Sequence, residues 1–299
     1  MKRIKFFSSY SSSPACAALY TRLYDIMNNE QYGKEYVFTI GENYTHAILL
    51  NTAMPILNIP KENVIGLAQE PIDYLNEKKD KKYMMKFFKY ARANIGKYFI
   101  GSIAEILGPP FINSYGYLTH IKPLSYLPTK TKIMSIMISE KFDAPGHKYR
   151  HMLTKEILKR ALPIDIYGKG CKYYYKNKDP RIKGEFNLRE PYEDYKFHIC
   201  IENFQKPHYF SEKITNTLLC NTTPIYYGCE NIDQYFPNIV IHLCGIIEKD
   251  IQLLDNICNH PSSYIKNINS KQIIEKISIE NVINIFNLFF YLYFFIIKC

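Results

Sequence analysis

The sequence predicts an α/β protein made of two doubly wound domains, and three observations favour this class. Short apolar runs, typical of strands buried on both faces of a parallel sheet, alternate with helix-like stretches. A proline-rich segment, residues 108–130, interrupts this alternation, which then restarts. The chain has 299 residues, of which 47% are hydrophobic, so it is too long for one small core and suits two domains.

The first half of the chain contains five strand-like and two helix-like stretches. We expect strands at 2–8, 36–40, 46–51, 64–68 and 98–100, and helices at 15–29 and 72–95. The fourth strand ends at Gln69-Glu70, immediately before Pro71. Residues 108–130 combine four prolines with little periodicity, which predicts a linker.

The second half repeats the alternation. We expect strands at 132–138, 164–167, 195–201, 223–227 and 240–243, and helices at 147–161 and 211–220. The sequence therefore predicts an N-terminal domain over residues 1–128, a second domain over 129–270 and an apolar C-terminal tail over 271–299. Ligands of doubly wound folds bind beyond the carboxyl ends of the strands, so we expect the site in a cleft between the two domains.

The formal net charge of +10 is compatible with an anionic partner. The alternative is that the surplus of lysine only keeps the protein soluble, because basic residues are spread along the chain rather than grouped. The basic residues are not gathered with aromatic residues into a recognition module. Binding to nucleic acid is therefore the interpretation that the sequence favours least.

The eight cysteines include no CxxC pair and fit neither a zinc site nor a redox motif. We interpret them as reduced, which together with the lack of a signal peptide or N-terminal membrane anchor predicts a cytoplasmic protein. The apolar stretch 283–297 is shorter than the roughly 20 residues that a membrane-spanning helix needs. We expect it to form a helix packed on the protein, and the alternative is a weak anchor on a membrane surface.

Several familiar motifs are missing. The chain has no P-loop, no HExxH and no GxSxG, and Gly168-Lys169-Gly170 lacks the third glycine of a dinucleotide fingerprint. It also has no Asp-x-Asp, the usual carboxylate pair that holds a metal ion against a nucleotide diphosphate. We therefore expect no metal and no cofactor, and a nucleotide-sugar would have its diphosphate charge offset by protein cations.

Residues 208–228 point to such a ligand. The strand before them ends in Glu202-Asn203, and Ser211 is suited to cap the next helix, whose N-terminal amides attract phosphate. Glu212 complements the helix dipole, but Lys213 in the first turn is unfavourable unless an anion binds there. We expect Lys213 to bind a diphosphate and Glu212 to accept hydrogen bonds from ribose hydroxyls. The alternative is a solvated Glu–Lys pair.

Residues 195–236 resemble the donor-binding signature of the α-1,3-fucosyltransferases, glycosyltransferase family 10. The matching pieces are YKF with Glu202-Asn203, Tyr209, Ser211-Glu212-Lys213, the run from Pro224 to Gly228, Asn231-Ile232 and Tyr235-Phe236. This sequence departs from the signature at Ser211, where Thr is common, at Tyr227, where Trp is frequent, and at His208, where Gly is frequent. The last two departures leave the shape of the sugar pocket open.

The resemblance implies a GT-B fold with two Rossmann-like domains, of which residues 1–128 bind the acceptor and residues 129–270 bind the nucleotide-sugar donor. It also implies inverting transfer of fucose from GDP-fucose to a hydroxyl of an acceptor glycan. It extends more thinly to 139–170, where it points to Arg150 as a phosphate ligand, ahead of His147 and Lys148. Arginine suits this role because its planar fork binds phosphate oxygens in pairs. The resemblance also implies that Asn203 and Tyr209 contact the donor, with Glu202, Tyr227 and Gly228 as further pocket residues.

Glu70 is the candidate catalytic base. Inverting transfer needs a group that takes the proton of the acceptor hydroxyl, and the family carries a Glu near this point of the chain. A carboxylate partly removed from water has a raised pKa that suits this task. Asp73 could substitute, and Glu70 could instead cap the following helix. Two alternatives for the whole chain stay open: a transferase for another GDP-sugar, and a relative that binds the sugar-nucleotide without transferring it.

Overall fold

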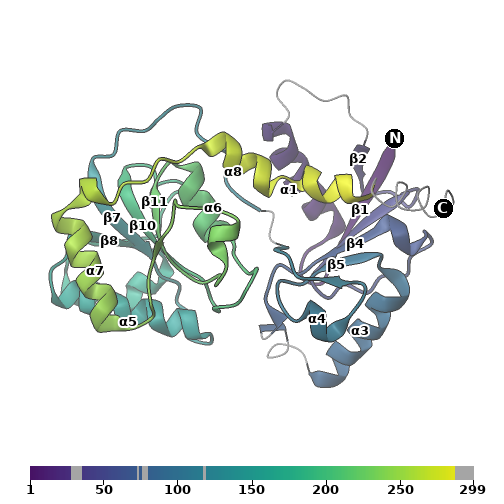
Figure 1. The fold of residues 1–299 in the computed structure, drawn as a ribbon, viewed down its shortest axis with the longest axis horizontal. Coiled ribbons are helices and arrows are strands. Elements are labelled where there is room, and N and C mark those ends of the chain that lie inside the picture. The colour runs from purple at the N-terminus through teal and green to yellow at the C-terminus, as the bar shows by residue number, and fades with distance from the viewer. Residues whose placement is uncertain (28–35, 73, 76–79, 117–118, 287–299) are drawn as a thin grey trace. The chain divides into compact units, whose positions relative to one another are not determined.

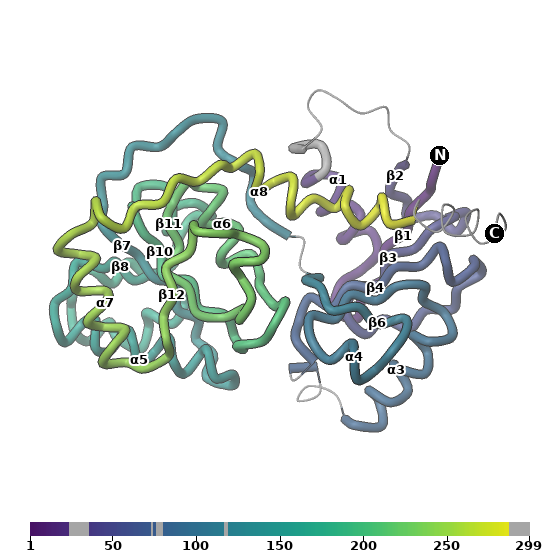
Figure 2. Tube along the Cα trace, in the orientation of Figure 1, coloured from purple at the N-terminus to yellow at the C-terminus, as the bar shows by residue number. Residues whose placement is uncertain are grey.

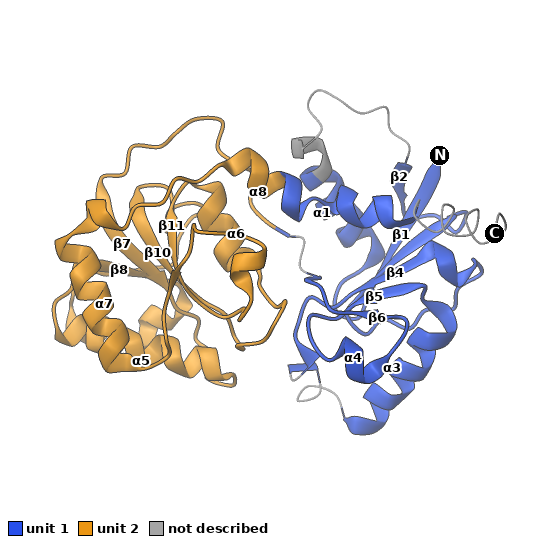
Figure 3. Cartoon of the chain, in the orientation of Figure 1, with its two compact units in different colours: residues 1–119, 275–299 blue, residues 120–274 orange. Residues whose placement is uncertain are grey.

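The computed structural model describes residues 1–27, 36–72, 74–75, 80–116 and 119–286. The chain divides into two compact units (Figure 3). Unit 1 contains residues 1–119 and 275–299, and unit 2 contains residues 120–274. The second division lies within helix α8 (Ser270–Ile277). Each unit has its own six-stranded sheet, in which every strand pair is parallel.

Unit 1 is a doubly wound α/β domain (Figure 1). Its strands are β1 (Lys2–Ser8), β2 (Tyr36–Thr39), β3 (His46–Leu50), β4 (Val64–Leu67), β5 (Lys97–Phe99) and β6 (Phe111–Ile112), in the order β2-β1-β3-β4-β5-β6. Its helices include α1 (Ser13–Met27), α3 (Lys81–Asn94) and α4 (Ala104–Leu107). The chain moves to one side of β1 for β2 and to the other side for β3, so the direction of winding reverses between β1 and β3.

Strand β3 shows why both faces of this sheet are covered. Ile48 and Leu50 pack in a cluster with Tyr20 of α1, whereas Ala47 and Leu49 pack in a second cluster with Phe87 of α3. Successive side chains of a strand point to opposite faces, so a strand covered on both sides must be apolar throughout. The continuous apolar run at 47–50 is therefore the signature of a three-layer domain.

The C-terminal part of the chain returns to unit 1 (Figure 2). Residues 279–286 are helical, and Ile279, Val282, Ile283 and Phe286 are buried in the same cluster as Ile4 and Phe6 of β1. The start of the apolar stretch thus packs on the protein, while residues 287–299 of the predicted tail lie outside the described residues. Within the described ranges, no helix has both the length and the apolar character to cross a membrane.

Unit 2 is also doubly wound. Its strands are β7 (Lys132–Met137), β8 (Ile164–Tyr167), β9 (Ile182–Gly184), β10 (Tyr195–Ile201), β11 (Thr223–Tyr227) and β12 (Ile241–His242), in the order β12-β11-β10-β7-β8-β9. The helices are α5 (Pro145–Lys159), α6 (Glu212–Leu219), α7 (Ile247–Asn259) and the start of α8. Here the direction of winding reverses between β7 and β10, which are hydrogen-bonded neighbours.

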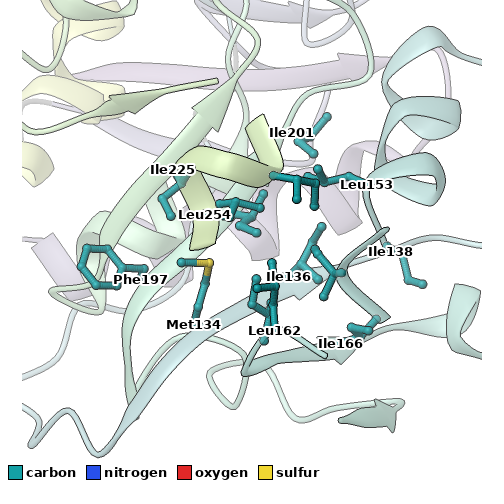
Figure 4. Packing of buried hydrophobic residues seen from close by; sticks show 14 of the residues in the cluster. Met134, Ile136, Ile138, Leu153, Leu162, Ile166, Phe197, Ile201, Ile225 and Leu254 are labelled. Atoms are coloured by element: carbon teal, nitrogen blue, oxygen red, sulfur yellow. The ribbon is translucent and has the colours of Figure 1, made fainter. Parts of the chain in front are cut away.

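The main core of unit 2 lies between the sheet and helices α5 and α7 (Figure 4). Met134 and Ile136 of β7 and Ile199 of β10 pack there against Leu153 of α5 and Leu254 of α7. The alternate residues of the strands face the side of α6 and are partly polar. Ser135 Oγ lies 2.8 Å from His198 Nδ1, and Cys200 Sγ lies 3.1 Å from Thr217 Oγ1 of α6.

The prediction of two doubly wound α/β domains is confirmed, and two local predictions are wrong. Residues 72–95 are not one helix, because α3 begins at Lys81, where the Asp80 side chain caps it by accepting a 2.7 Å hydrogen bond from Tyr83 N. The segment 108–130 is not wholly a linker, because residues 111–112 form β6 and pair with β5. All seven described cysteines are free thiols, as expected.

Candidate functional site

The candidate site is a pocket of about 530 Å³ in unit 2. It lies at the carboxyl ends of β7, β8 and β10 and is also lined by the first turns of α5 and α6. The winding of the sheet reverses between β7 and β10, and in open α/β sheets the crevice at such a switch point is where ligands bind. The strand order alone therefore predicts a ligand pocket at this place.

Close packing places helix α5 against the end of β10. Gly146 N donates a 2.9 Å hydrogen bond to Asn203 O, and a Cβ at Gly146 would lie 1.8 Å from Glu202 O. Only glycine fits at such a distance, because the clash would be with backbone. The first turns of α5 consequently bring His147 and Arg150 to the pocket, whereas Lys148 is exposed and does not line it.

Arg150 is the most informative side chain of the pocket. It is 6% exposed, its Nε donates to Gly146 O at 3.2 Å, and its Nη2 donates to Asn203 Oδ1 at 2.6 Å. Of the five N–H groups of a guanidinium, these contacts use two. Within the part of the chain that the structure describes, no carboxylate forms an ion pair with Arg150. Burial lowers the pKa of Arg150, although Glu202 opposes this shift.

A buried cation without an anionic partner is costly, because the protein interior replaces little of the lost hydration. The unused N–H groups of Arg150 lie at a pocket that is open to a ligand. Neighbouring His147 adds no second charge at neutral pH, because burial and the Arg150 cation lower its pKa to about 4, against the opposing effect of Asp143. The arrangement is therefore suited to an anion that offers two oxygen atoms to one guanidinium.

Glu202, a predicted pocket residue, does not line the pocket but lies beneath it. It is 0% exposed and accepts three hydrogen bonds: from Ser211 N at 2.9 Å, from Ser211 Oγ at 2.7 Å and from Lys213 Nζ at 3.1 Å. Ser211 is the N-cap of α6, as expected, with its Oγ 3.5 Å from Lys213 N. Glu202 thus fixes both the N-terminus of α6 and the Lys213 ammonium.

This network changes the interpretation of Lys213. Its position in the first turn does not by itself require a bound anion, because the chain supplies one: Glu202, with Glu212 Oε1 also 3.6 Å from Lys213 Nζ. Burial alone would lower the pKa of Lys213, but the Glu202 and Glu212 carboxylates outweigh it and raise the pKa. Lys213 and Glu212 both line the pocket, so they lie beside Arg150 at the same opening.

The other predicted donor residues lie around this centre. Asn203 lines the pocket and orients Arg150 through its Oδ1 atom. Tyr209 is buried and is not among the lining residues. Tyr227, at the end of β11, packs against Tyr149 with ring centroids 5.0 Å apart. Gly228 borders Glu202, whose Cγ would lie 2.5 Å from a Cβ at that position.

Several residues that line the pocket were not predicted from the sequence, and four of them carry a charge, a ring nitrogen or a special backbone conformation. Lys141 follows β7, Gly168 and Lys169 follow β8, and His198 belongs to β10. Gly168 and Lys169 could have been found from the GKG segment, because glycine and a basic residue directly after a strand indicate a ligand site even without a dinucleotide fingerprint. Gly168 has φ = +102°, and a Cβ there would lie 2.3 Å from Ile138 O, so the segment needs glycine for a close turn beside β7.

His208 occupies a position where the family signature often has glycine, and its backbone explains that preference. Its φ is +60°, in the left-handed region that glycine adopts most readily. Two contacts hold it there: His208 N donates to Asn231 Oδ1 at 2.7 Å, and the ring Nδ1 lies 2.6 Å from Tyr235 Oη. Asn231 and Tyr235 flank a short 3-10 helix (Ile232–Gln234) after β11. Their hydrogen bonds to His208 offset the cost of placing histidine where glycine is frequent.

Glu70 belongs to unit 1. It follows β4, it is partly buried, and its backbone N donates to Asn51 Oδ1 at 3.3 Å. The alternative base, Asp73, lies outside the described residues. In the described ranges, no three His, Cys, Asp or Glu side chains are grouped to hold a metal ion.

Residues 127–266 match the family described as "Glycosyltransferase family 10 (fucosyltransferase) C-term". That range contains the whole pocket and every predicted donor residue.

Curated relatives match shorter parts of the chain. α-(1,3)-Fucosyltransferase B of Drosophila melanogaster is 36% identical over 98 residues, which are 30% of this chain and 21% of that protein. GDP-fucose protein O-fucosyltransferase 3 of Danio rerio is 25% identical over 166 residues, 52% of this chain and 35% of that protein. Putative fucosyltransferase R654 of Acanthamoeba polyphaga mimivirus is 27% identical over 174 residues, 51% of this chain and 28% of that protein. The chain thus spans about a third or less of these relatives.

Solved structures resemble the chain over nearly its full length. HepE of Anabaena, in complex with UDP and glucose, has a TM-score of 0.62 at 11% identity and covers 97% of this chain and 98% of its own. An α1,3-fucosyltransferase has a TM-score of 0.53 at 13% identity and covers 96% of this chain and 89% of its own. At such identities the likeness concerns the fold, and it confirms the predicted GT-B type.

Proposed function

We propose that this chain, whose residues 127–266 match glycosyltransferase family 10 (fucosyltransferase), transfers fucose from GDP-fucose to a hydroxyl of an acceptor glycan, with inversion at the anomeric carbon. The observation that supports this best is the buried guanidinium of Arg150, which faces the unit 2 pocket without a carboxylate partner among the described residues. A diphosphate supplies the paired oxygens that this group lacks. The fucosyltransferase names of the relatives support the choice of sugar.

In this proposal, Arg150 and Lys213 hold the two phosphates of the donor and stabilise the charge that develops on GDP as it leaves. Glu212, at the rim of the pocket, accepts hydrogen bonds from ribose or fucose hydroxyls, and Asn203 keeps its Nδ2 group available to donate one. Tyr209 is buried outside the pocket lining, and its link to the site is its electrostatic effect on Arg150. The cations act where negative charge accumulates, which is the most effective place for electrostatic stabilisation.

The transfer step needs one base. The acceptor oxygen attacks the anomeric carbon from the face opposite the diphosphate, the bond from that carbon to the diphosphate oxygen breaks, and GDP leaves with the electron pair. The acceptor proton goes to the Glu70 carboxylate. This step forms a glycosidic bond between the acceptor oxygen and the anomeric carbon, whose configuration is inverted, and it releases GDP.

Replacing Glu70 by Gln should lower the rate of transfer by about 100-fold to 10,000-fold, the usual contribution of a general base. Binding of GDP should stay within about twofold of the wild type, because the donor residues belong to unit 2. Initial rates of fucose transfer and calorimetric titration with GDP measure the two effects. Glu62→Gln, an exposed Glu of the same unit, is the control. A Glu70→Gln enzyme with at least half of the wild-type rate would remove Glu70 from the proposed role.

We also propose that the reaction needs no metal ion, because the pocket provides side-chain cations for the diphosphate. Transfer or hydrolysis of GDP-fucose should therefore proceed in excess EDTA at a rate within about twofold of the rate in added Mg²⁺. Loss of all activity on chelation, restored by Mg²⁺ or Mn²⁺, would contradict this assignment.

The identity of the nucleotide and of the sugar is tested by comparing ligands one at a time. GDP and GDP-fucose should protect the chain from thermal unfolding more than UDP and UDP-glucose, and GDP-fucose should give product where GDP-mannose does not. If GDP-mannose binds and gives product, the result would instead support a transferase for another GDP-sugar. Binding of GDP-fucose with neither hydrolysis nor transfer would support a relative that only binds the sugar-nucleotide.

A further inference from the structure

Positive charge is concentrated in one part of unit 2. Residues 141–183 contain twelve Lys and Arg but four Asp and Glu, so their net charge is +8, against +10 for the whole chain. This span runs from the loop after β7 through α5 and β8 into β9, and it corrects the expectation of an even spread of basic residues. Arg150 is buried at the pocket and Arg181 is partly buried. The remaining cations are mostly exposed lysines: Lys141, Lys148, Lys155, Lys159, Lys169, Lys172, Lys176, Lys178 and Lys183.

Contacts within the span bring several of these lysines to one surface. Arg181 Nη1 and Nη2 donate to three carbonyl groups at and after the end of α5, at 2.6 to 3.1 Å. Tyr174 lies between the short 3-10 helices η2 (Lys169–Tyr173) and η3 (Tyr175–Asn177), and its Oη is 2.9 Å from His151 Nδ1 of α5. Helices η2 and η3 therefore lie along α5. We call the exposed side chains of Lys148, Met152, Lys155, Lys159, Tyr173, Tyr175, Lys176, Asn177 and Lys178 the basic face.

Helix α5 contributes a stripe to the basic face. Lys148, Met152, Lys155 and Lys159 follow one another at spacings of four, three and four residues, so one side of the helix carries three cations around an exposed methionine. The opposite side of α5 is buried in the core of unit 2. Among the described residues, Lys148 and Lys155 form no ion pair, and Lys159 pairs with Glu156 at 3.5 Å. The charge of this stripe is thus largely available to an anionic partner.

A hollow of about 350 Å³ opens on the basic face. Its single lining carboxylate, Asp179, is neutralised within the chain, because Arg181 Nε and Nη2 donate to it at 2.9 and 2.6 Å. Lys155 and Lys159 therefore set the charge of the hollow, and the Asn177 amide adds further donors. These groups are suited to a phosphate group that is held at a surface.

The aromatic rings beside the hollow favour a lipid surface over a nucleic acid. Phe142 lies flat on His151 with ring centroids 4.1 Å apart, and Tyr173 meets these two rings edge-on at 5.3 and 5.7 Å. Ring faces that are used within the chain are less open to stacking with bases. Tyrosine side chains with exposed hydroxyl ends, in contrast, are typical of the headgroup level of a membrane.

The type of cation favours the same partner. Apart from Arg160, which pairs with Glu156 at 3.5 Å, the exposed cations of residues 141–183 are lysines. Arginine is the usual choice for recognising nucleic acid because of its planar fork, whereas clustered lysines near an exposed apolar group are typical of attraction to anionic lipids. Met152 is such an apolar group.

We propose that the basic face docks on an anionic lipid surface. Lys155, Lys159 and Asn177 surround one headgroup phosphate, and Met152 and Tyr173 enter the headgroup layer. No residue of the basic face lines the unit 2 pocket, so binding of lipid and binding of GDP are measured separately.

The test is co-sedimentation of the full chain with vesicles. One set contains phosphatidylcholine alone, and the other contains phosphatidylcholine with about one third phosphatidylglycerol. At about 0.1 M NaCl the chain should bind the anionic vesicles at least tenfold more tightly than the neutral ones. Raising NaCl to about 0.5 M should weaken this binding by at least tenfold, because salt screens the lysines from the lipid charge.

Matched charge reversals locate the binding. Lys155→Glu combined with Lys159→Glu should weaken binding to the anionic vesicles by at least tenfold. Lys82→Glu combined with Lys86→Glu makes the same change in net charge at the same spacing, on exposed positions of α3, and should weaken binding by less than about threefold. The milder pair Lys155→Gln and Lys159→Gln should weaken binding by at least threefold, which keeps the test valid if the reversal unfolds the protein.

Each other outcome contradicts the proposal. Equal weakening by the α5 and α3 reversals would mean that net charge, and not the basic face, attracts the lipid. Equal binding to neutral and anionic vesicles would point to an apolar contact, such as one made by the stretch 283–297. Binding of a single-stranded oligonucleotide that the α5 reversal abolishes, with no binding to vesicles, would assign the face to nucleic acid.

Stabilisation by GDP separates this inference from the proposed function. Both reversed variants should keep the wild-type stabilisation by GDP, because the changed residues lie outside the unit 2 pocket. Protein that binds anionic vesicles through the basic face but is not stabilised by GDP would overturn the proposed function alone. Protein that is stabilised by GDP but does not bind the vesicles would overturn the lipid-binding face alone.

Discussion

Replacing Arg150 by Met should abolish the stabilisation of this protein by GDP without lowering the stability of the free protein. Met replaces the aliphatic part of the side chain and removes a buried cation that has no ion-pair partner among the described residues. We therefore expect a melting temperature equal to or above that of the wild type without GDP, because the desolvation penalty of the guanidinium disappears. The rate of transfer should fall by about 100-fold to 1000-fold, as when one donor to a developing oxyanion is removed.

Thermal unfolding with and without GDP measures both parts of this expectation. At a GDP concentration of 100 times the dissociation constant, the wild type should gain about 2.7 kcal/mol of stability. Lys148→Met, which removes an exposed cation from the same helix outside the pocket, should keep this gain in full. A strong loss of stability in Arg150→Met without GDP would mean that the guanidinium is structural and that its burial needs no ligand.

The second large effect concerns Glu202. Replacing Glu202 by Gln should lower the free energy of unfolding by about 3–5 kcal/mol, the usual consequence of removing one partner of a buried ion pair. The amide keeps one acceptor for three donors, from Ser211 N, Ser211 Oγ and Lys213 Nζ, and it places an N–H₂ group against one of them.

A double-mutant cycle with Lys213→Met separates the pair from its surroundings. The two changes together should destabilise the protein by less than the sum of the single changes, with a coupling of about 0.5–3 kcal/mol. Glu156→Gln, which removes a carboxylate paired on the surface with Lys159 and Arg160 at 3.5 Å, should change stability by no more than about 1 kcal/mol. Additive effects of Glu202→Gln and Lys213→Met would contradict the network described for the start of α6.

The sequence predicted most of the sheet in unit 2, because its strands are buried on both faces. Strands β8, β10 and β11 have the predicted bounds of 164–167, 195–201 and 223–227, since each mainly apolar run is followed directly by glycine or by a polar residue. Helix α7 was not predicted, although Ile251, Leu254 and Ile257 repeat at helical spacing and are fully buried. Strand β9 is an edge strand of three residues, and such a short segment has no periodicity to detect.

The residue types of the site could be predicted from the sequence, but their pairing could not. The sequence placed Glu202, Glu212 and Lys213 close together and suggested that Lys213 awaits an anion. Only the folded backbone shows that Glu202, at the end of β10, already neutralises Lys213, while Arg150 has no such partner within the described ranges. The packing of α5 and α6 against the end of β10 decides which of the two cations has a carboxylate partner. Arg150 of α5 meets Asn203, about 50 residues further along the chain, whereas Lys213 of α6 meets Glu202, about 10 residues before it.

The most direct test of the account is a crystal structure of the chain with GDP. We expect the diphosphate in the unit 2 pocket, with phosphate oxygens about 2.7–2.9 Å from the Arg150 guanidinium, the distance of a charge-assisted hydrogen bond. GDP bound elsewhere, or bound in this pocket with the Arg150 N–H groups turned away from both phosphates, would contradict the assignment of Arg150 as the group that recognises the donor.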